Sequence, residues 1–155
     1  MTQQLISLAI LFFYFGILAK GVQFFCKKIF QSTFNELGQK STFTAVLVIP
    51  ALLLIPLSNS FYETSLMTSF FDFTALLGRQ ALQIAFHLAA SIVGLIVLTI
   101  LGRIFIATHE SEESDSTGIL IGLILMSIII ALILFPFLSA TIADIVPKQE
   151  IQGFR

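Results

Sequence analysis

The sequence predicts an all-α integral membrane protein with four transmembrane helices, and three observations lead to this prediction. Residues 117–143 carry no charged side chain, and a helix of 27 residues exceeds the ~30 Å hydrocarbon core of a bilayer. Apolar residues make up 57% of the chain and charged residues 11%, which is too apolar for burial in water to explain. Three further long apolar stretches precede residue 117. Lipid offers no hydrogen bonds to a bare backbone, so each stretch is predicted to be a helix.

The first predicted span covers residues 5–25. Lys20 lies near its end, where the ammonium group can reach the lipid headgroups. Gly16, Lys20, Gln23 and Lys27 are spaced by four, three and four residues and therefore share one helix face. One interpretation is that Lys20 only extends its ammonium group to the headgroups. The alternative is that a neighbouring helix or a water-filled crevice lies at this face. No signal-peptide pattern is evident, so the segment is interpreted as an anchor, followed by an interfacial piece at 28–40.

The second predicted span covers residues 41–62 and contains two prolines, Pro50 and Pro56. Each proline removes a backbone hydrogen-bond donor and tends to kink a helix. We favour a structural role for these kinks over a role in gating a pathway. The span ends in a polar cluster around Asn59. Residues 63–78 are too short and too polar to span, and their aromatic residues predict a short helix lying in the headgroup region.

The third predicted span, residues 80–106, carries the most informative pattern. Gln83, His87 and Ser91 are four residues apart, and Gly94 and Gly102 continue the same polar or small face. Such a face should look toward other helices or a cavity, because polar groups directed at acyl chains are costly. His87 is then either a neutral imidazole bonded across a helix interface or a proton-handling group. We favour the first, since no intramembrane carboxylate completes a relay.

The fourth predicted span, residues 117–143, opens with Gly118 and Gly122, a GxxxG pair that predicts close helix packing. The segment before it has four carboxylates in residues 110–115. We interpret it as a solvated loop beside a helix N-terminus rather than as a calcium site. Cys26 is the one cysteine and is interpreted as a small apolar residue. The sequence therefore predicts no metal and no cofactor.

The chain is predicted to form a single membrane domain, residues 1–155, built from two tandem two-helix repeats. Shifted by 75 residues, Ile29, Phe30 and Thr33 match Ile104, Phe105 and Thr108, and Ser41-Thr42 matches Ser116-Thr117. Repeat one then covers about 3–62, the interfacial segment 63–78, and repeat two about 79–146. Five basic residues lie near loops one and three against three on the other side, so both loops are expected in the cytoplasm and both termini outside.

Short segments recur in the two copies of the repeat: QKSTFTA at 39–45 and SDSTG at 114–118, with IPLSNSF and FPFLSAT at the ends of the second and fourth helices. With these segments, the chain resembles the domain of unknown function 350 family of small bacterial inner-membrane proteins. The family's Asn is replaced in both copies. The resemblance implies a four-span bacterial inner-membrane protein without an assigned reaction.

Two non-enzymatic functions remain, because no catalytic motif is present and the net charge of -1 argues against a nucleic-acid surface. The first is a homo-oligomeric membrane scaffold, sensor or pore subunit that serves a cytosolic or membrane partner protein. The second is a small channel or transporter. Its pathway would be lined by Lys20, Gln83, His87, Ser91 and Asn59.

Overall fold

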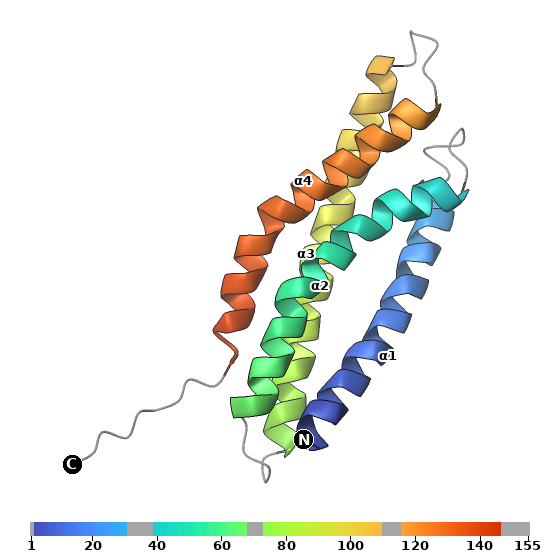
Figure 1. Cartoon of the computed structure of the whole chain (residues 1–155). Helices are drawn as coiled ribbons and strands as arrows, with labels where there is room; N and C mark the ends of the chain where they lie inside the picture. Colours follow the sequence, from blue (N-terminus) through green and yellow to red (C-terminus); the bar gives the residue numbers. More distant parts are fainter. Residues whose placement is uncertain (1, 31–38, 68–72, 110–115, 147–155) are drawn as a thin grey trace, which may run out of the picture.

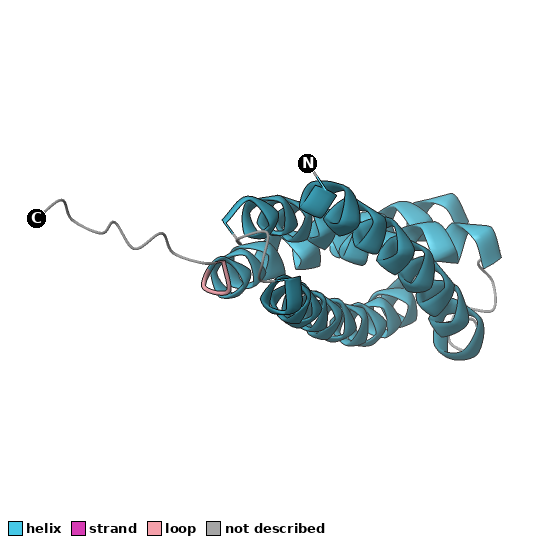
Figure 2. Ribbon diagram, turned by 90° about the horizontal axis from the view of Figure 1, so that it is seen from below, coloured by secondary structure: helices cyan, strands magenta, loops and turns pink. Residues whose placement is uncertain are grey.

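The computed structural model describes residues 2–30, 39–67, 73–109 and 116–146, which form four long helices (Figure 1). These are α1 (Thr2–Phe25), α2 (Gln39–Met67), α3 (Phe73–His109) and α4 (Ser116–Ala143), and α1 continues into a π-helical turn, η1 (Cys26–Phe30). Figure 2 shows that the described residues contain helices and one terminal turn but no strand. The structure therefore confirms the all-helical fold class.

All four α-helices are long and apolar enough to cross a membrane. The apolar spans are Gln3–Lys28, Phe43–Leu66, Phe73–Thr108 and Thr117–Ala143. Their number and order agree with the prediction, and the fourth has the predicted bounds. The first three are longer than predicted, because the residues that flank each apolar stretch continue the backbone hydrogen bonds of the helix.

Helix α2 is the central element, and it packs against α1, α3 and α4. Helices α3 and α4 also pack against each other, whereas α1 lies at the edge of the group (Figure 1). Hydrogen bonds between Gln80 and Ser7 and between Tyr14 and His87 join α3 to α1, and each links residues 73 positions apart. The constant offset means that α1 and α3 run parallel.

Both proline-containing helices continue through their prolines. Pro50 and Pro56 lie inside α2, and Pro136 lies inside α4. Figure 1 shows α2 changing direction along its length. A proline lacks the amide proton and its ring crowds the preceding turn, so a bend rather than a break is the expected result when neighbouring helices hold both halves.

The segment predicted as an interfacial helix, residues 63–78, is divided between two long helices instead. Residues 63–67 belong to the end of α2 and residues 73–78 to the start of α3, while 68–72 lie outside the described residues. Thr64 and Leu76 are fully buried, so packing against neighbouring helices extends both helices into this polar stretch. Most of the interfacial piece at 28–40, the acidic loop 110–115 and the tail from 147 also lie outside the described part.

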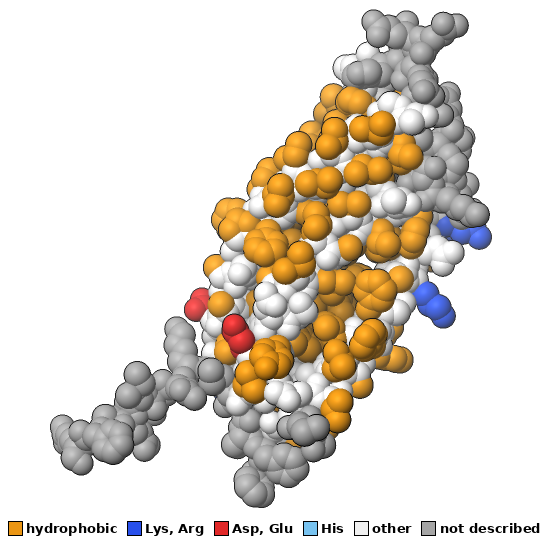
Figure 3. All heavy atoms as spheres, viewed as in Figure 1, with side chains coloured by type: hydrophobic (Ala, Val, Ile, Leu, Met, Phe, Trp, Pro, Cys, Tyr) orange, Lys and Arg blue, Asp and Glu red, His pale blue; other side chains and the backbone are white. Residues whose placement is uncertain are grey.

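The surface of the described helices is largely apolar. Figure 3 shows hydrophobic side chains over most of one face, with charged side chains at its edges. Phe13 is 75% exposed on α1 and Phe137 is 69% exposed on α4, whereas Leu53 and Leu98 are fully buried between helices. Such exposed apolar side chains are stable when acyl chains surround them, which agrees with four spanning helices.

Candidate functional site

A stripe of polar side chains runs along the inner face of the first half of α3. Its members are Gln80, Gln83, His87 and Ser91, and none is more than 2% exposed. Steps of three or four residues keep them on one face of the helix. With 1.5 Å of rise per residue, the eleven-residue separation from Gln80 to Ser91 corresponds to about 16 Å. We call these four residues the α3 polar stripe.

The two glutamines of the stripe bond to hydroxyl groups on α1 and α2. Gln80 Nε2 donates to Ser7 Oγ at 2.5 Å. Gln83 Nε2 donates to Ser60 Oγ and to Thr64 Oγ1, both at 2.8 Å. Both amide protons of Gln83 are therefore used, and the three helices are held together at this end by side-chain hydrogen bonds.

His87 sits between α1 and α2 and contacts both. Its Nε2 lies 3.2 Å from the carbonyl oxygen of Pro50, and its Nδ1 lies 2.5 Å from the hydroxyl of Tyr14. A carbonyl can only accept, so in the neutral imidazole Nε2 carries the proton and Nδ1 accepts from the Tyr14 hydroxyl. The two rings meet edge to face, with centroids 5.5 Å apart and an interplanar angle of 85°. The Pro50 carbonyl thus fixes the tautomer of the imidazole, and Tyr14 helps to fix its orientation.

Three buried oxygens of the stripe have no hydrogen-bond partner among the described residues: Gln80 Oε1, Gln83 Oε1 and Ser91 Oγ. Such groups are rare, because leaving a buried acceptor unpaired costs about 1–3 kcal/mol. Ser127 on α4 provides a contrast. It is also fully buried, but its hydroxyl donates to the carbonyl of Leu123 at 2.8 Å. The polar stripe therefore retains unused acceptor capacity.

Beyond Ser91 the same face of α3 becomes apolar and tightly packed. Gly94 is buried, and a Cβ added there would lie 2.8 Å from Ile49 Cγ2 and 3.1 Å from Leu134 Cδ1. Leu98 is fully buried, and Gly102 is buried as well. Gly94 thus allows α3 to approach α2 and α4, and the stripe ends near the middle of α3.

The other polar residues predicted for this face do not join the stripe. Lys20 and Gln23 on α1 and Asn59 on α2 are exposed on the outside of the helix group. On α1 the buried residues Tyr14, Leu18 and Val22 mark the inner face. Lys20 and Gln23 lie on the opposite side, because they are offset from Leu18 by two and five residues at 100° per residue.

The two glycines of the GxxxG pair on α4 have different surroundings. A Cβ at Gly122 would lie 2.6 Å from the ring of Phe105 on α3, so this glycine allows an aromatic side chain to pack against the α4 backbone. A Cβ at Gly118 would meet nothing within 4 Å, and Gly118 is exposed. Within one chain, Gly122 alone of the pair serves close packing.

Sequence reasoning missed the partners of the stripe. The sequence did not single out Ser7, Tyr14 or Thr64, Ser60 belonged only to the polar cluster around Asn59, and Gln80 marked only the start of a span. One signal was available: Ser7 and Tyr14 are seven residues apart, and so are Gln80 and His87. Two parallel helices with polar residues at equal spacing can pair them in register, but single hydroxyl residues in apolar helices are too common to be assigned a partner from sequence.

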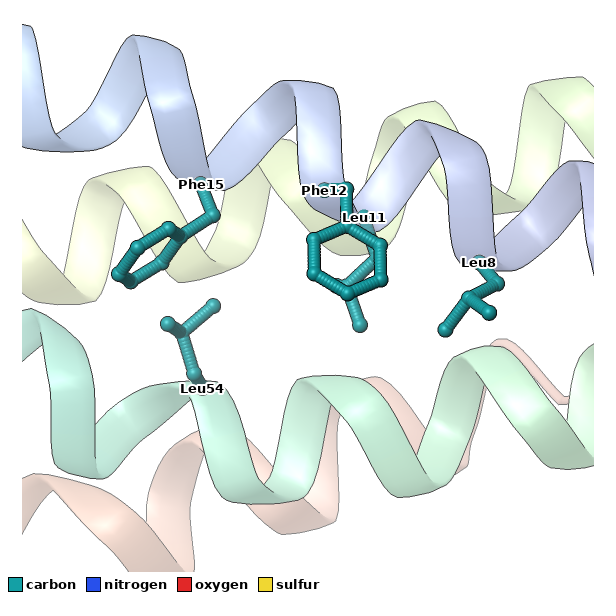
Figure 4. A pocket seen from close by; sticks show the side chains of 5 residues that line it. All are labelled: Leu8, Leu11, Phe12, Phe15 and Leu54. Atoms are coloured by element: carbon teal, nitrogen blue, oxygen red, sulfur yellow. The ribbon is translucent and has the colours of Figure 1, made fainter.

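Two grooves flank α1. The first, of about 300 Å³, lies between α1 and α2 and is lined only by apolar residues: Leu8, Leu11, Phe12, Phe15 and Leu54 (Figure 4). The second, of about 350 Å³, lies between α1 and α3 and reaches Pro50 of α2. Ser91 lines this second groove among apolar neighbours. A smaller pocket of about 70 Å³ lies beside Ser7 and Ser65.

Among the described residues, no group of three or more His, Cys, Asp or Glu side chains could hold a metal ion. The hydrogen-bonding side chains of the stripe and its partners are two amides, an imidazole, a phenol and several hydroxyls. Comparison of the chain with protein-family models, with curated proteins and with solved structures found no match.

Proposed function

We propose that the chain is a non-enzymatic subunit of a homo-oligomeric membrane assembly, in the class of scaffolds, sensors and pore subunits, and that it serves a cytosolic or membrane partner protein. One observation carries the choice of this class over a channel or transporter. The α3 polar stripe ends at Ser91, and the same face continues with Gly94 and Leu98, packed against apolar side chains. A single chain thus offers polar groups across only part of the membrane.

The predicted pathway residues are also divided between the inside and the outside of the helix group. Gln83 and His87 are bonded to hydroxyl and carbonyl groups of the same chain, whereas Lys20 and Asn59 face outward. A conducting path needs polar groups that line one continuous space. The arrangement instead suits a polar core that fixes how three helices pack.

Flux measurements in liposomes test this choice. Purified protein is reconstituted, and movement of H⁺, Na⁺ and K⁺ is followed with ion-sensitive dyes. We expect rates equal to those of protein-free liposomes, and no change in His87→Ala, because the stripe does not cross the membrane and the partner protein that a pore subunit would serve is absent from the liposomes. Flux above the empty control that disappears in His87→Ala would contradict the proposal and favour the channel.

The outer face of α1 supports assembly of several copies. Gly16, Lys20 and Gln23 are all exposed on this face, away from Leu18 and the rest of the chain. A Cβ added at Gly16 would meet nothing within 4 Å, so the α1 backbone is open to a neighbour there. Small residues let membrane helices approach closely, and an amide such as Gln23 gains by bonding to another helix.

A Gly16→Leu variant tests this interface. Leucine at this position fits the single chain but separates two copies of α1, so we expect fewer copies per detergent-solubilised particle, by light scattering or native mass spectrometry. The matched control is Gly78→Leu, since Gly78 on α3 is equally open, and this variant should keep the wild-type mass. A monomeric wild-type particle, or a Gly16→Leu particle of unchanged mass, would contradict the proposed interface.

The location in a bacterial inner membrane, with both termini outside and the loops after α1 and α3 in the cytoplasm, belongs to the same proposal. It is supported by four helices long enough to span and by the distribution of basic residues. Membership of the domain of unknown function 350 family and the tandem two-helix repeat are likewise proposed, on the short motifs and on the parallel course of α1 and α3.

A further inference from the structure

We infer that the groove between α1 and α3 binds a neutral lipophilic molecule that carries one hydrogen-bonding group, such as a hydroxyl or carbonyl, and that Ser91 is the residue that recognises this group. The inference does not depend on the proposed oligomer. It rests on the groove of about 350 Å³ and on Ser91, a residue of its lining whose hydroxyl has no hydrogen-bond partner among the described residues.

The Ser91 hydroxyl differs from the other hydroxyls in the middle of the helices. Serine and threonine inside a helix commonly donate to the carbonyl four residues earlier. Thr99, on the same helix, donates to Leu95 at 2.8 Å, and Ser127 on α4 donates to Leu123 at the same distance. Ser91 Oγ is fully buried and has no hydrogen-bond partner among the described residues. Its hydrogen-bonding capacity is therefore not used by the described part of the chain.

Water does not suit the groove. A buried water needs about two to four polar partners. Ser91 is the only residue lining the groove with a polar side chain, since its neighbours there include Leu18, Val22, Leu88 and Leu95. The carbonyl of Pro50, which also lines the groove, already accepts from His87. A single hydroxyl in an apolar groove fits a molecule with an apolar body and one polar group.

An acyl chain of the bilayer would fill the groove without satisfying Ser91. Ser91 is the central residue of α3, eighteen residues from either end, which corresponds to about 27 Å along the helix. Lipid headgroups and glycerol esters lie near the membrane surfaces, so a phospholipid presents only hydrocarbon at this depth. A molecule that is dissolved in the bilayer and carries its own polar group supplies what a phospholipid lacks.

The second groove, between α1 and α2, is an internal control. It has a similar volume, about 300 Å³, and also lies against α1, but all of its lining side chains are hydrocarbon. Phe12 and Phe15 of α1 and Leu54 of α2 face this space (Figure 4). A purely apolar preference would fill both grooves alike, whereas recognition by a hydroxyl favours the groove at Ser91.

Photolabelling of the full chain in liposomes tests the inference. The probes are an eight-carbon alcohol that carries a diazirine and the diazirine-bearing hydrocarbon of the same length without the hydroxyl. Labelled residues are identified by peptide mass spectrometry. We expect the alcohol to label groove residues such as Leu18 and Leu95, in competition with unlabelled octanol. Labelling should fall about fivefold in Ser91→Ala, the effect of losing one net hydrogen bond.

Two comparisons separate recognition from simple filling. The hydrocarbon probe should label both grooves similarly and should not respond to Ser91→Ala. Gly21→Leu should block both probes in the groove that contains Ser91 but not in the groove that contains Phe12. Gly21 lines the first groove, and a Cβ added at Gly21 meets nothing within 4 Å. Equal labelling of both grooves by the alcohol, or no response to Ser91→Ala, would overturn the inference. Absence of labelling in the wild type would also overturn it, because the groove would then be covered.

Discussion

The imidazole of His87 forms hydrogen bonds with one residue on each of two neighbouring helices. The Pro50 carbonyl accepts from Nε2, and Nδ1 accepts from Tyr14. No other titratable ring is fully buried in the described spans, and its bonding groups all come from the same chain. In a membrane the alternative to such bonds is an unsatisfied imidazole in hydrocarbon, so the pair with Tyr14 contributes to the stability of the α1–α3 contact.

The Tyr14→Phe substitution measures that contribution. It removes one oxygen, leaves the ring in place and leaves Nδ1 of His87 without its donor. We expect the free energy of unfolding in detergent to fall by about 0.5–2 kcal/mol, the range for hydrogen bonds between membrane helices and for an unpaired buried acceptor. The control is Tyr62→Phe, because Tyr62 is 58% exposed on α2. Equal stability of the two variants would show that the bond to His87 adds nothing.

At the scale of the helices, two kinds of contact hold the group together. At one end, α1, α2 and α3 are joined by polar side chains of the stripe and its partners. Further along α3, the side chains of Ile49 on α2 and Leu134 on α4 pack against Gly94, which has no side chain of its own to keep them away. A hydrogen bond between side chains fixes the register of one helix against another, because its two partners meet only when the helices are aligned. A small residue fixes the distance between helices, because neighbours can approach its backbone closely.

Gly94→Ala tests the second kind of contact. The added methyl group would lie 2.8 Å from a branch of the fully buried Ile49, so neighbouring helices must shift. We expect a loss of about 1–3 kcal/mol in the free energy of unfolding, the usual cost of overpacking. The matched change is Gly118→Ala on α4, which meets nothing within 4 Å and should be neutral or stabilising, since alanine favours the helix. Similar effects at both glycines would argue against close packing at Gly94.

For the whole molecule, charge at the ends of α1 sets the expected orientation. Lys28 lies over the ring of Phe24, with Nζ 5.2 Å from its centroid, which holds one positive charge at this end of the helix. Lys27 and Lys28 belong to the five basic residues near loops one and three, against three near the other side. The sequence-based orientation therefore depends on a difference of two residues.

Replacing Lys27 and Lys28 with glutamine makes the two sides equal, at three basic residues each. We expect the wild-type chain to place a C-terminal reporter outside the cytoplasm and the double variant to show mixed orientation, because basic residues near the spans determine topology. The measurement is the activity of paired reporters that work on opposite sides of the membrane. A cytoplasmic C-terminus in the wild type would reverse the proposed topology.

The sequence determined the fold class, the four spans and the location of the stripe on α3, because hydrocarbon must surround any long uncharged helix and polar side chains at helical spacing share a face. It also predicted that this face looks toward other helices or a cavity, but it did not determine which polar residues of the other spans share the interior. Gln83, His87 and Ser91 lie inside the helix group, whereas Lys20, Gln23 and Asn59, which sequence reasoning joined to them, lie outside.

The tertiary structure decided which groups pair, because partners such as Tyr14 and His87 are 73 residues apart and meet only when α1 and α3 run in parallel register. It also decided that residues 63–67 and 73–78 extend long helices. Thr64 and Leu76 are fully buried against neighbouring helices, although polar residues surround them in the sequence. Side-chain periodicity fixes the face of a helix, but only the packing of helices fixes what that face meets.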